Sequence, residues 1–348
     1  MADRVVVVAP NWLGDAVMAL PAVASVRRQW PSAHLAVAAR ASVAPLFTLV
    51  AGVDAVITLE TTTGLGAVAR WRRDAHRLAS AGADTALLLP NSFVSAWIVA
   101  QAPIGERWGY AADLRARLLT RAVPRPRTLL HQADYYLALV EALGITPAPP
   151  YAQVQVRGAA LEARTRLLEG HGLAAAAPFV AMAPGAAYGK AKQWPPERFA
   201  ELAARIHAEL GWRAVLVGTR SDAPVCAGIA RDVQRREPGT PAPVDLSGQT
   251  DLPALAAVLA SARAVVANDS GAMHLAGAVG APVVALFGST NEQQTTPLTA
   301  APDAPRPRVI THAAWCRPCM LRECPIDHRC MRGITAHAVM ASITDLVR

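Results

Sequence analysis

Short runs of β-branched and small apolar residues alternate along this chain with longer stretches in which apolar positions recur every three or four residues. In the first half, this pattern predicts strands at 5–8, 34–38, 55–59 and 85–89, with helices near 16–29, 42–50, 67–80 and 92–101. In the second half, it predicts strands at 179–183, 214–217, 264–267 and 283–287, with helices near 196–210, 252–261 and 270–279. Such alternation is typical of parallel sheets covered by helices on both faces. The pattern therefore predicts an α/β chain with two doubly wound domains.

The length and composition agree with two domains. The chain has 348 residues, of which 53% are hydrophobic, and this is enough material for two cores. The stretch Pro147-Ala-Pro-Pro150 suits the start of a linker between them. We expect an N-terminal domain over 1–160, a second domain over 161–335 and a closing helix within 336–348.

The apolar segments do not predict insertion into a membrane. The two longest, 86–104 and 265–287, are interrupted by polar residues that include Asn91 and Asp269. The apolar run near the N-terminus covers only 5–9, which is too short for the core of a signal peptide. We therefore expect a cytoplasmic protein.

Lysine occupies only two of the 34 basic positions of the chain, Lys190 and Lys192. Both lie in the segment Pro184-Gly-Ala-Ala-Tyr-Gly-Lys-Ala-Lys-Gln-Trp194, whose proline and glycines indicate a shaped turn. An ammonium group is a compact, strongly hydrated charge with rotatable donors, unlike the planar guanidinium of arginine. This difference favours a phosphate pocket at the turn, although two lysines on a solvated loop would give the same pattern.

The loop after the first predicted strand carries a carboxylate. Ligands of open α/β sheets bind outside the carboxyl ends of the strands, so residues in these loops are candidates for chemistry. The loop reads Pro10-Asn-Trp-Leu-Gly-Asp15, and Asp15 suits a helix cap and a catalytic role equally well. Gly14 stands alone there, so the loop lacks the three glycines of a dinucleotide-binding fingerprint.

Two loops of the second half also carry acids after predicted strands. In Gly218-Thr-Arg-Ser-Asp222, the acid suits contact with a ribose hydroxyl or a polar helix start. The segment Asn268-Asp-Ser-Gly-Ala-Met-His274 follows a buried strand and opens a helix, whose unpaired N–H groups and dipole favour an anion. Ser270 is compatible with a helix cap or with ligand contact, and His274 with a ligand neighbour or a core residue.

Positive charge is concentrated in one part of the first half. The net charge of the chain is +8, and between Arg107 and Arg127 six arginines are accompanied by a single acid, Asp113. This cluster suits an anionic partner, such as a phosphorylated lipid or an acidic glycan, or a plain solvated surface. Few aromatic residues are interleaved with the arginines, so we expect no nucleic-acid partner.

Four of the five cysteines are close together in the sequence, at Cys316, Cys319, Cys324 and Cys330. Four thiols within so short a segment resemble a closed structural zinc site. The spacing is looser than that of two CxxC pairs, so unpaired or redox-labile thiols remain an alternative, and disulfides a weaker one in a reducing cytoplasm. A structural zinc ion is thus the metal that the sequence favours.

Four separated motifs together resemble a known family. They are Pro10-Asn-Trp-Leu-Gly-Asp15, Leu89-Pro-Asn-Ser-Phe93, Pro184-Gly with Lys192-Gln-Trp-Pro195, and Asn268-Asp-Ser-Gly-Ala-Met-His274. In this order, and over nearly the whole length, they resemble the lipopolysaccharide heptosyltransferases of glycosyltransferase family 9. The resemblance implies a GT-B architecture, in which two Rossmann-like domains face each other across a cleft. It further implies that the helix within 336–348 crosses back to the first domain.

The resemblance implies an inverting transfer of L-glycero-D-manno-heptose from ADP-heptose to the first heptose of the phosphorylated lipopolysaccharide inner core. Asp15 would take the proton of the acceptor hydroxyl, and Lys192 would stabilise the departing diphosphate. The residues implied at the donor are Asp222, Asp269, Ser270, Gly271, Ala272 and His274. Those implied at the acceptor are Asn11, Asn91, Arg107, Arg115 and Arg117.

No cofactor is obligatory for this reaction, because a lysine and a helix dipole can stabilise the leaving group without a divalent metal. The acceptor is a glycolipid, so we expect transient, peripheral contact with the inner leaflet of the cytoplasmic membrane. Three alternatives stay open on the sequence. They are a family 9 heptosyltransferase with a different acceptor position, a nucleotide-sugar epimerase, and a non-catalytic nucleotide-sugar-binding protein.

Overall fold

The computed structural model describes residues 3–60, 64 and 66–348. Within it the chain forms two compact units, Met1–Ala152 and Gln153–Arg348. The boundary falls earlier than the predicted one after residue 160. The reason is that Val154, which precedes the predicted boundary, already forms a hydrogen bond within the second unit. Its N–H donates to the carbonyl of Ala278 at 2.9 Å.

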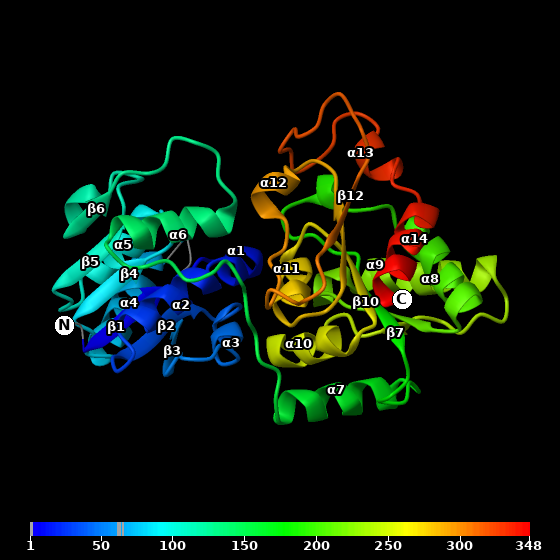
Figure 1. Ribbon diagram of the computed structural model, residues 1–348, viewed down its shortest axis with the longest axis horizontal. Coiled ribbons are helices and arrows are strands. Elements are labelled where there is room, and N and C mark those ends of the chain that lie inside the picture. The colour runs from blue at the N-terminus through cyan, green and yellow to red at the C-terminus, as the bar shows by residue number, and fades with distance from the viewer. Residues whose placement is uncertain (1–2, 61–63, 65) are drawn as a thin grey trace. The chain divides into compact units, whose positions relative to one another are not determined.

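The first unit is built on a parallel sheet of six strands (Figure 1). These are β1 (Arg4–Val8), β2 (His34–Arg40), β3 (Ala55–Leu59), β4 (Thr85–Leu88), β5 (Glu106–Tyr110) and β6 (Arg121–Val123). The helices described in this unit are α1 (Leu13–Met18), α2 (Leu20–Gln29), α3 (Ala44–Phe47), α4 (Ala67–Ser80), α5 (Phe93–Ala100) and α6 (Gln132–Ala142), with a 3₁₀ turn, η1 (Ala116–Leu118).

The strand order in this sheet is β3-β2-β1-β4-β5-β6. Helix α2 packs against α6, and α4 packs against α5. Val6 and Val8 of β1 share a core cluster with Leu78 of α4 and Ile98 of α5. Val5 and Val7 are buried as well, as expected for a parallel strand that is covered on both faces.

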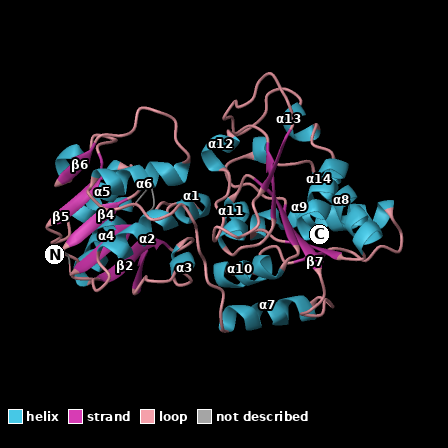
Figure 2. Ribbon diagram, viewed as in Figure 1, coloured by secondary structure: helices cyan, strands magenta, loops and turns pink. Residues whose placement is uncertain are grey.

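The second unit repeats this design, with strands and helices alternating along the chain (Figure 2). Its strands are β7 (Phe179–Ala183), β8 (Arg213–Leu216), β9 (Val244–Asp245), β10 (Ala264–Asn268), β11 (Val283–Phe287) and β12 (Arg308–Thr311). Its helices are α7 (Ala159–Gly170), α8 (Pro196–Leu210), α9 (Ala223–Arg236), α10 (Leu252–Ser261), α11 (Gly271–Ala278), α12 (Glu292–Thr295), α13 (Arg329–Arg332) and α14 (Ala336–Val347). Two 3₁₀ turns, η2 (Lys190–Lys192) and η3 (Arg220–Asp222), complete the unit.

The second sheet has the order β12-β11-β10-β7-β8-β9. Counted within each unit, both sheets follow the order 3-2-1-4-5-6, and every strand pair in both is parallel. This is the strand order of the Rossmann fold. The predicted class, an α/β chain with two Rossmann-like doubly wound domains, is confirmed.

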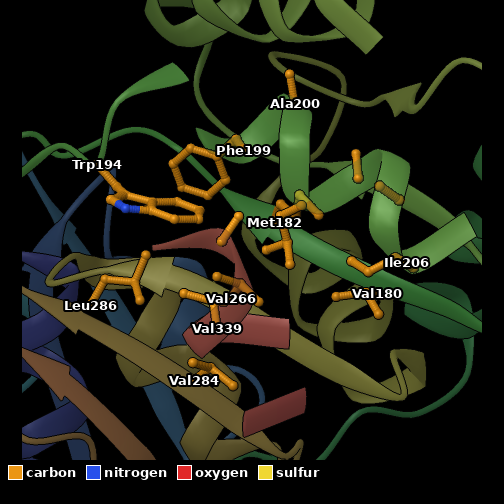
Figure 3. Close-up of a cluster of buried hydrophobic side chains, with 14 of the residues drawn as sticks. Val180, Met182, Trp194, Phe199, Ala200, Ile206, Val266, Val284, Leu286 and Val339 are labelled. Atoms are coloured by element: carbon orange, nitrogen blue, oxygen red, sulfur yellow. The ribbon is translucent and has the colours of Figure 1, made fainter. Parts of the chain in front are cut away.

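One hydrophobic core of the second unit includes Trp194, which is 1% exposed. Figure 3 shows its indole beside Phe199 of α8, and the two ring centroids lie 4.8 Å apart. The indole Nε1 donates a hydrogen bond to the carbonyl of Ile334 at 3.0 Å. Trp194, at the end of the lysine segment, is therefore held by a ring contact and by a hydrogen bond.

The closing helix α14 belongs to the second unit, where the resemblance had implied a helix that crosses back to the first. It packs against α8, β10 and β11. Its apolar positions Val339, Met340 and Ile343 are buried in the same core as Trp194 (Figure 3 labels Val339). The apolar stripe of the helix is therefore covered within the second unit.

Several elements were not predicted from the hydrophobic pattern, among them β5, β6 and β12. Strand β5 contains Glu106, Arg107 and Gly109, β6 is three residues long, and both ends of β12 are exposed. These strands lie towards the edges of the sheets, where the apolar pattern is interrupted. Within the described residues, no helix is long and apolar enough to span a membrane.

Candidate active site

Each sheet has one position where the strand order reverses, between β1 and β4 in the first unit and between β7 and β10 in the second. Loops that leave neighbouring strands in opposite directions open a crevice there, and ligands of Rossmann-like sheets bind in it. The predicted residues Asp15 and Asn91 follow β1 and β4, and Lys192 and Asp269 follow β7 and β10. The topology thus places these residues at the carboxyl ends of the strands that flank the switch point of their own unit.

In the second unit, the lysine segment meets the loop after β10 through an ion pair. Lys192 Nζ lies 2.6 Å from Asp269 Oδ2, with the two side chains 12% and 4% exposed. The same carboxylate oxygen accepts a hydrogen bond of 2.7 Å from the hydroxyl of Thr290, which follows β11. The ammonium group also lies 4.8 Å from the ring centroid of Tyr188. Lys192 is therefore held in place and does not extend into solvent.

Asn268, the last residue of β10, ties the two loops together. Its Oδ1 accepts from the backbone N–H of Trp194 at 3.0 Å, and its Nδ2 donates to the carbonyl of Pro184 at 2.8 Å. The side chain is fully buried. One asparagine thus satisfies both ends of the segment that carries Lys192, a role that the sequence did not reveal.

The start of α11 adds an anion-binding feature beside the ion pair. Ser270 is its N-cap residue but makes no side-chain cap bond, and its buried Oγ has no partner within the described chain. Gly271 and Ala272 form the first turn and are partly exposed. His274 is 2% exposed, with Nε2 3.9 Å from Asp269 Oδ1. The first turn of α11 therefore offers N–H groups and a hydroxyl to a ligand.

Asp222 has a structural task in the loop after β8. Its Oδ2 accepts from the backbone N–H and the hydroxyl of Thr219, at 2.8 and 2.7 Å, in a capping box. A Cβ on Gly185 would lie 2.6 Å from this carboxylate, so the glycine permits close packing. The carboxylate therefore supports the loop after β7, and the helix-start interpretation of Asp222 is the one that its contacts match.

The cysteine-rich segment packs directly on the turn that carries the two lysines. The carbonyl of Arg322 accepts from Ala191 N–H at 2.9 Å, and His328 Nε2 lies 2.9 Å from the Ala191 carbonyl. A Cβ on Gly189 would come within 2.3 Å of the Arg322 carbonyl oxygen. The segment therefore supports the shape of the turn, and residues from both line a pocket of about 640 Å³, among them the exposed Lys190.

The four clustered cysteines carry free thiols. Cys316, Cys319 and Cys324 are partly exposed, and Cys330 is 5% exposed. Burial raises the pKa of the Cys330 thiol, and the neighbouring thiols add to this. Across residues 3–60, 64 and 66–348, no three His, Cys, Asp or Glu side chains are grouped so that they could hold a metal ion. The side chains as arranged here do not fit the predicted zinc site.

In the first unit, Asp15 lies in the first turn of α1. The N-cap of this helix is Trp12, so Asp15 is not the cap that the sequence allowed. The side chain is partly exposed. Its charge lies near Tyr136 of α6, where burial, with a contribution from Asp15, raises the pKa of the phenol. Asp15 thus lies partly exposed at the start of α1 and is not its N-cap.

Asn11 and Asn91 lie at the same edge of this sheet. Asn11 lines a pocket of about 150 Å³ with residues of the neighbouring loops. Asn91 donates from Nδ2 to the hydroxyl of Tyr135 at 2.8 Å, and its buried Oδ1 has no partner within the described residues. These two of the five predicted acceptor residues therefore follow β1 and β4, at the switch point of the first sheet.

The predicted basic cluster divides into internal and exposed arginines. Arg115 is fully buried and donates to the carbonyls of Tyr110 and Pro90. It is turned inward by Asp113 and Leu114, which both have positive φ, 48° and 56°. Arg107 donates to the carbonyls of Leu118 and Ile104, at 2.9 and 2.7 Å. These two arginines hold loops of the unit together.

The remaining arginines of the cluster, Arg117, Arg121, Arg125 and Arg127, are exposed. Arg121 lies over the ring of Trp108, with Cζ 4.8 Å from the centroid. The surface charge that the sequence predicted thus rests on four residues instead of six.

Comparisons with known proteins show which family the chain resembles. A family model described as glycosyltransferase family 9 (heptosyltransferase) matches residues 71–329. Lipopolysaccharide heptosyltransferase 2 of Salmonella typhimurium is 30% identical over 308 residues, which cover 85% of this chain and 86% of the relative. The enzyme of the same name from Escherichia coli is 30% identical over 305 residues, with the same coverage of both chains.

A solved structure shows the same fold. The Escherichia coli ADP-heptose lipopolysaccharide heptosyltransferase II matches with a TM-score of 0.82 and 27% identity, covering 99% of this chain and 98% of that one. The heptosyltransferase WaaC of Escherichia coli with ADP matches with a TM-score of 0.73 at 18% identity. The family model spans most of the chain, and the relatives align over more than four fifths of it. This chain therefore belongs to glycosyltransferase family 9, the heptosyltransferase family.

Proposed function

We propose that the protein transfers L-glycero-D-manno-heptose from ADP-heptose to the first heptose of the lipopolysaccharide inner core. The observation that carries the proposal is the pairing of Lys192 with Asp269 at the switch point of the second sheet, beside the first turn of α11. This arrangement suits the diphosphate of a nucleotide-sugar. The relatives named lipopolysaccharide heptosyltransferase 2 support this choice of sugar and acceptor.

The reaction forms a bond between an acceptor hydroxyl oxygen and the anomeric carbon of the heptose, and it breaks the bond from that carbon to the diphosphate. The proton of the hydroxyl passes to the carboxylate of Asp15, and the electron pair of the broken bond leaves with ADP. Attack from the face opposite the diphosphate inverts the anomeric carbon. The sugar becomes positively charged as the bond breaks, by analogy with glycoside hydrolysis.

The second unit stabilises the negative charge that grows on the diphosphate. Lys192 Nζ has three N–H donors, and its bond to Asp269 uses one of them. The others, with the N–H groups and Ser270 hydroxyl at the start of α11, suit the phosphate oxygens. Asp269 holds the ammonium group in position and is itself held by Thr290, so it serves the reaction through Lys192.

The first prediction concerns the acceptor. The protein is incubated with ADP-heptose and acceptors that carry zero, one or two heptoses, and the products are read by mass. We expect one added heptose on the acceptor with one heptose and none on the other two. Transfer to the heptose-free acceptor would instead indicate a different family 9 heptosyltransferase. Donor binding without transfer to any acceptor would indicate a non-catalytic binding protein.

The second prediction concerns the proposed base. Asp15→Ala removes the proton acceptor, so turnover is expected to fall by about 10²- to 10⁴-fold. Binding of ADP-heptose, measured by calorimetric titration, is expected to change by less than about twofold, because Asp15 belongs to the first unit and the donor is assigned to the second. Equal losses of binding and turnover would contradict the assignment of Asp15 as base.

The third prediction concerns the ammonium group. Lys192→Ala removes a preorganised donor and is expected to lower turnover by about 10²- to 10³-fold. Lys192→Arg retains the charge but not the compact geometry, so it is expected to recover little of that loss. Lys190→Arg, two residues away and exposed, is the matched control and is expected to behave like the unchanged protein. Wild-type turnover in Lys192→Arg would show that the compact geometry of the ammonium group is not required.

The fourth prediction concerns location at the membrane. We propose that the exposed arginines Arg117, Arg125 and Arg127 attract anionic lipid or core phosphates. In co-sedimentation, the protein is expected to bind vesicles with anionic lipid better than purely zwitterionic ones, and less so as salt increases. Replacing the three arginines by Gln is expected to weaken this binding about 100-fold, at about 1 kcal/mol for each charge. Equal binding to both vesicle types would refute the proposal.

A further inference from the structure

The pocket of about 150 Å³ in the first unit contains an arginine that the proposed mechanism does not use. Arg40 is the last residue of β2, at the carboxyl end of the sheet, and its side chain lines the pocket. Its Nε is buried and has no hydrogen-bond partner within the described residues. No ion pair of Arg40 is found there either. Since an unpaired buried donor is unfavourable, this guanidinium is suited to a ligand that supplies the acceptor.

Most described lining residues of the pocket are apolar, and the few polar ones among them suit an anion attached to a sugar. Among its described lining residues, Arg40 is the only charged one. Asn11, Ser92 and Ser95 add polar groups, and Trp71 adds an aromatic ring on which the apolar face of a sugar can pack. A pocket of about 150 Å³ has room for a phosphate group.

A second guanidinium, that of Arg115, contacts residues that line the same pocket. Arg115 Nη1 bonds to the carbonyl of Pro90 and lies 3.3 Å from the hydroxyl of Ser95, and both of these residues line the pocket. Its Nη2 is buried without a partner, and no ion pair of Arg115 is found among the described residues. Burial lowers the pKa of Arg115 to about 10. A buried charge of this kind is stabilised by an anion nearby.

We propose that this pocket binds a phosphate group on a sugar of the acceptor, with Arg40 in direct contact and Arg115 acting through Pro90 and Ser95. The inference rests on the proposed function, because it takes the acceptor to be an inner-core glycan. Asn11 belongs to the pocket and to the loop that leads into α1, so a phosphate bound there would locate the acceptor next to the segment that carries Asp15. Arg40 thereby determines the preference for phosphorylated acceptors.

The test compares two delipidated acceptors that differ only in the phosphate. The unchanged protein is expected to prefer the phosphorylated acceptor by about tenfold or more in kcat/KM. Arg40→Gln is expected to remove this preference by lowering kcat/KM for the phosphorylated acceptor alone, whereas Arg40→Lys keeps part of it. Arg28→Gln, an exposed arginine on α2 with the same change in charge, is the control and is expected to keep the preference.

Two results would overturn the proposal. One is an equal loss with both acceptors in Arg40→Gln, which would indicate a purely structural role. The other is an unchanged preference in that variant. Since the acceptors carry no lipid, a preference seen with them identifies the sugar phosphate and excludes a lipid headgroup as its source.

A binding measurement separates this proposal from the proposed function. Inorganic phosphate is titrated into the protein in the presence of ADP, which is expected to occupy the proposed diphosphate site of the second unit. Saturable binding that is lost in Arg40→Gln and kept in Arg28→Gln would support the pocket even if no heptose is transferred. Equal phosphate binding by Arg40→Gln and the unchanged protein would refute it.

Discussion

The ion pair between Lys192 and Asp269 is the interaction that holds together the proposed diphosphate site. It joins the loops after β7 and β10, which leave the sheet in opposite directions at its switch point. Removal of one partner of a buried ion pair leaves the other charge uncompensated. Both residues are therefore needed to keep the two loops together. Asn268, Thr290 and the cysteine-rich segment all act on this pair by holding its two loops.

The two units share one strand order and present different side chains at its switch point. In the second, the switch point gathers an ammonium group and the start of a helix, which suit a diphosphate. In the first, the loop after β1 leads to the carboxylate of Asp15, and Arg40 lines a pocket of the same unit beside which Arg115 is buried. A fold that presents loops at one edge of a parallel sheet permits this, because the loop residues can change while the strands that position them do not.

The sequence predicted those features that depend on local pattern. Buried parallel strands such as Val5–Val8 appear as continuous apolar runs, and the rarity of lysine singled out the segment that carries Lys190 and Lys192. The partners of a residue were harder to predict. A charged residue normally indicates a surface, so the burial of Arg115 was missed, and the apolar stripe of α14 did not reveal which domain would cover it. The capping box at Thr219 and Asp222 did have a sequence signal in its spacing.

The presence of only two lysines permits a direct measurement at the central ion pair. In protein labelled with ¹³C at the lysine ε-carbons, the spectrum contains one signal for Lys190 and one for Lys192, assigned with Lys190→Arg. Addition of ADP is expected to shift the Lys192 signal strongly and to leave that of the exposed Lys190 nearly unchanged. Adenosine, which lacks the diphosphate, is expected to shift neither signal. A bound ADP that shifts Lys190 alone, or neither signal, would contradict the assignment of the diphosphate to Lys192 and the start of α11.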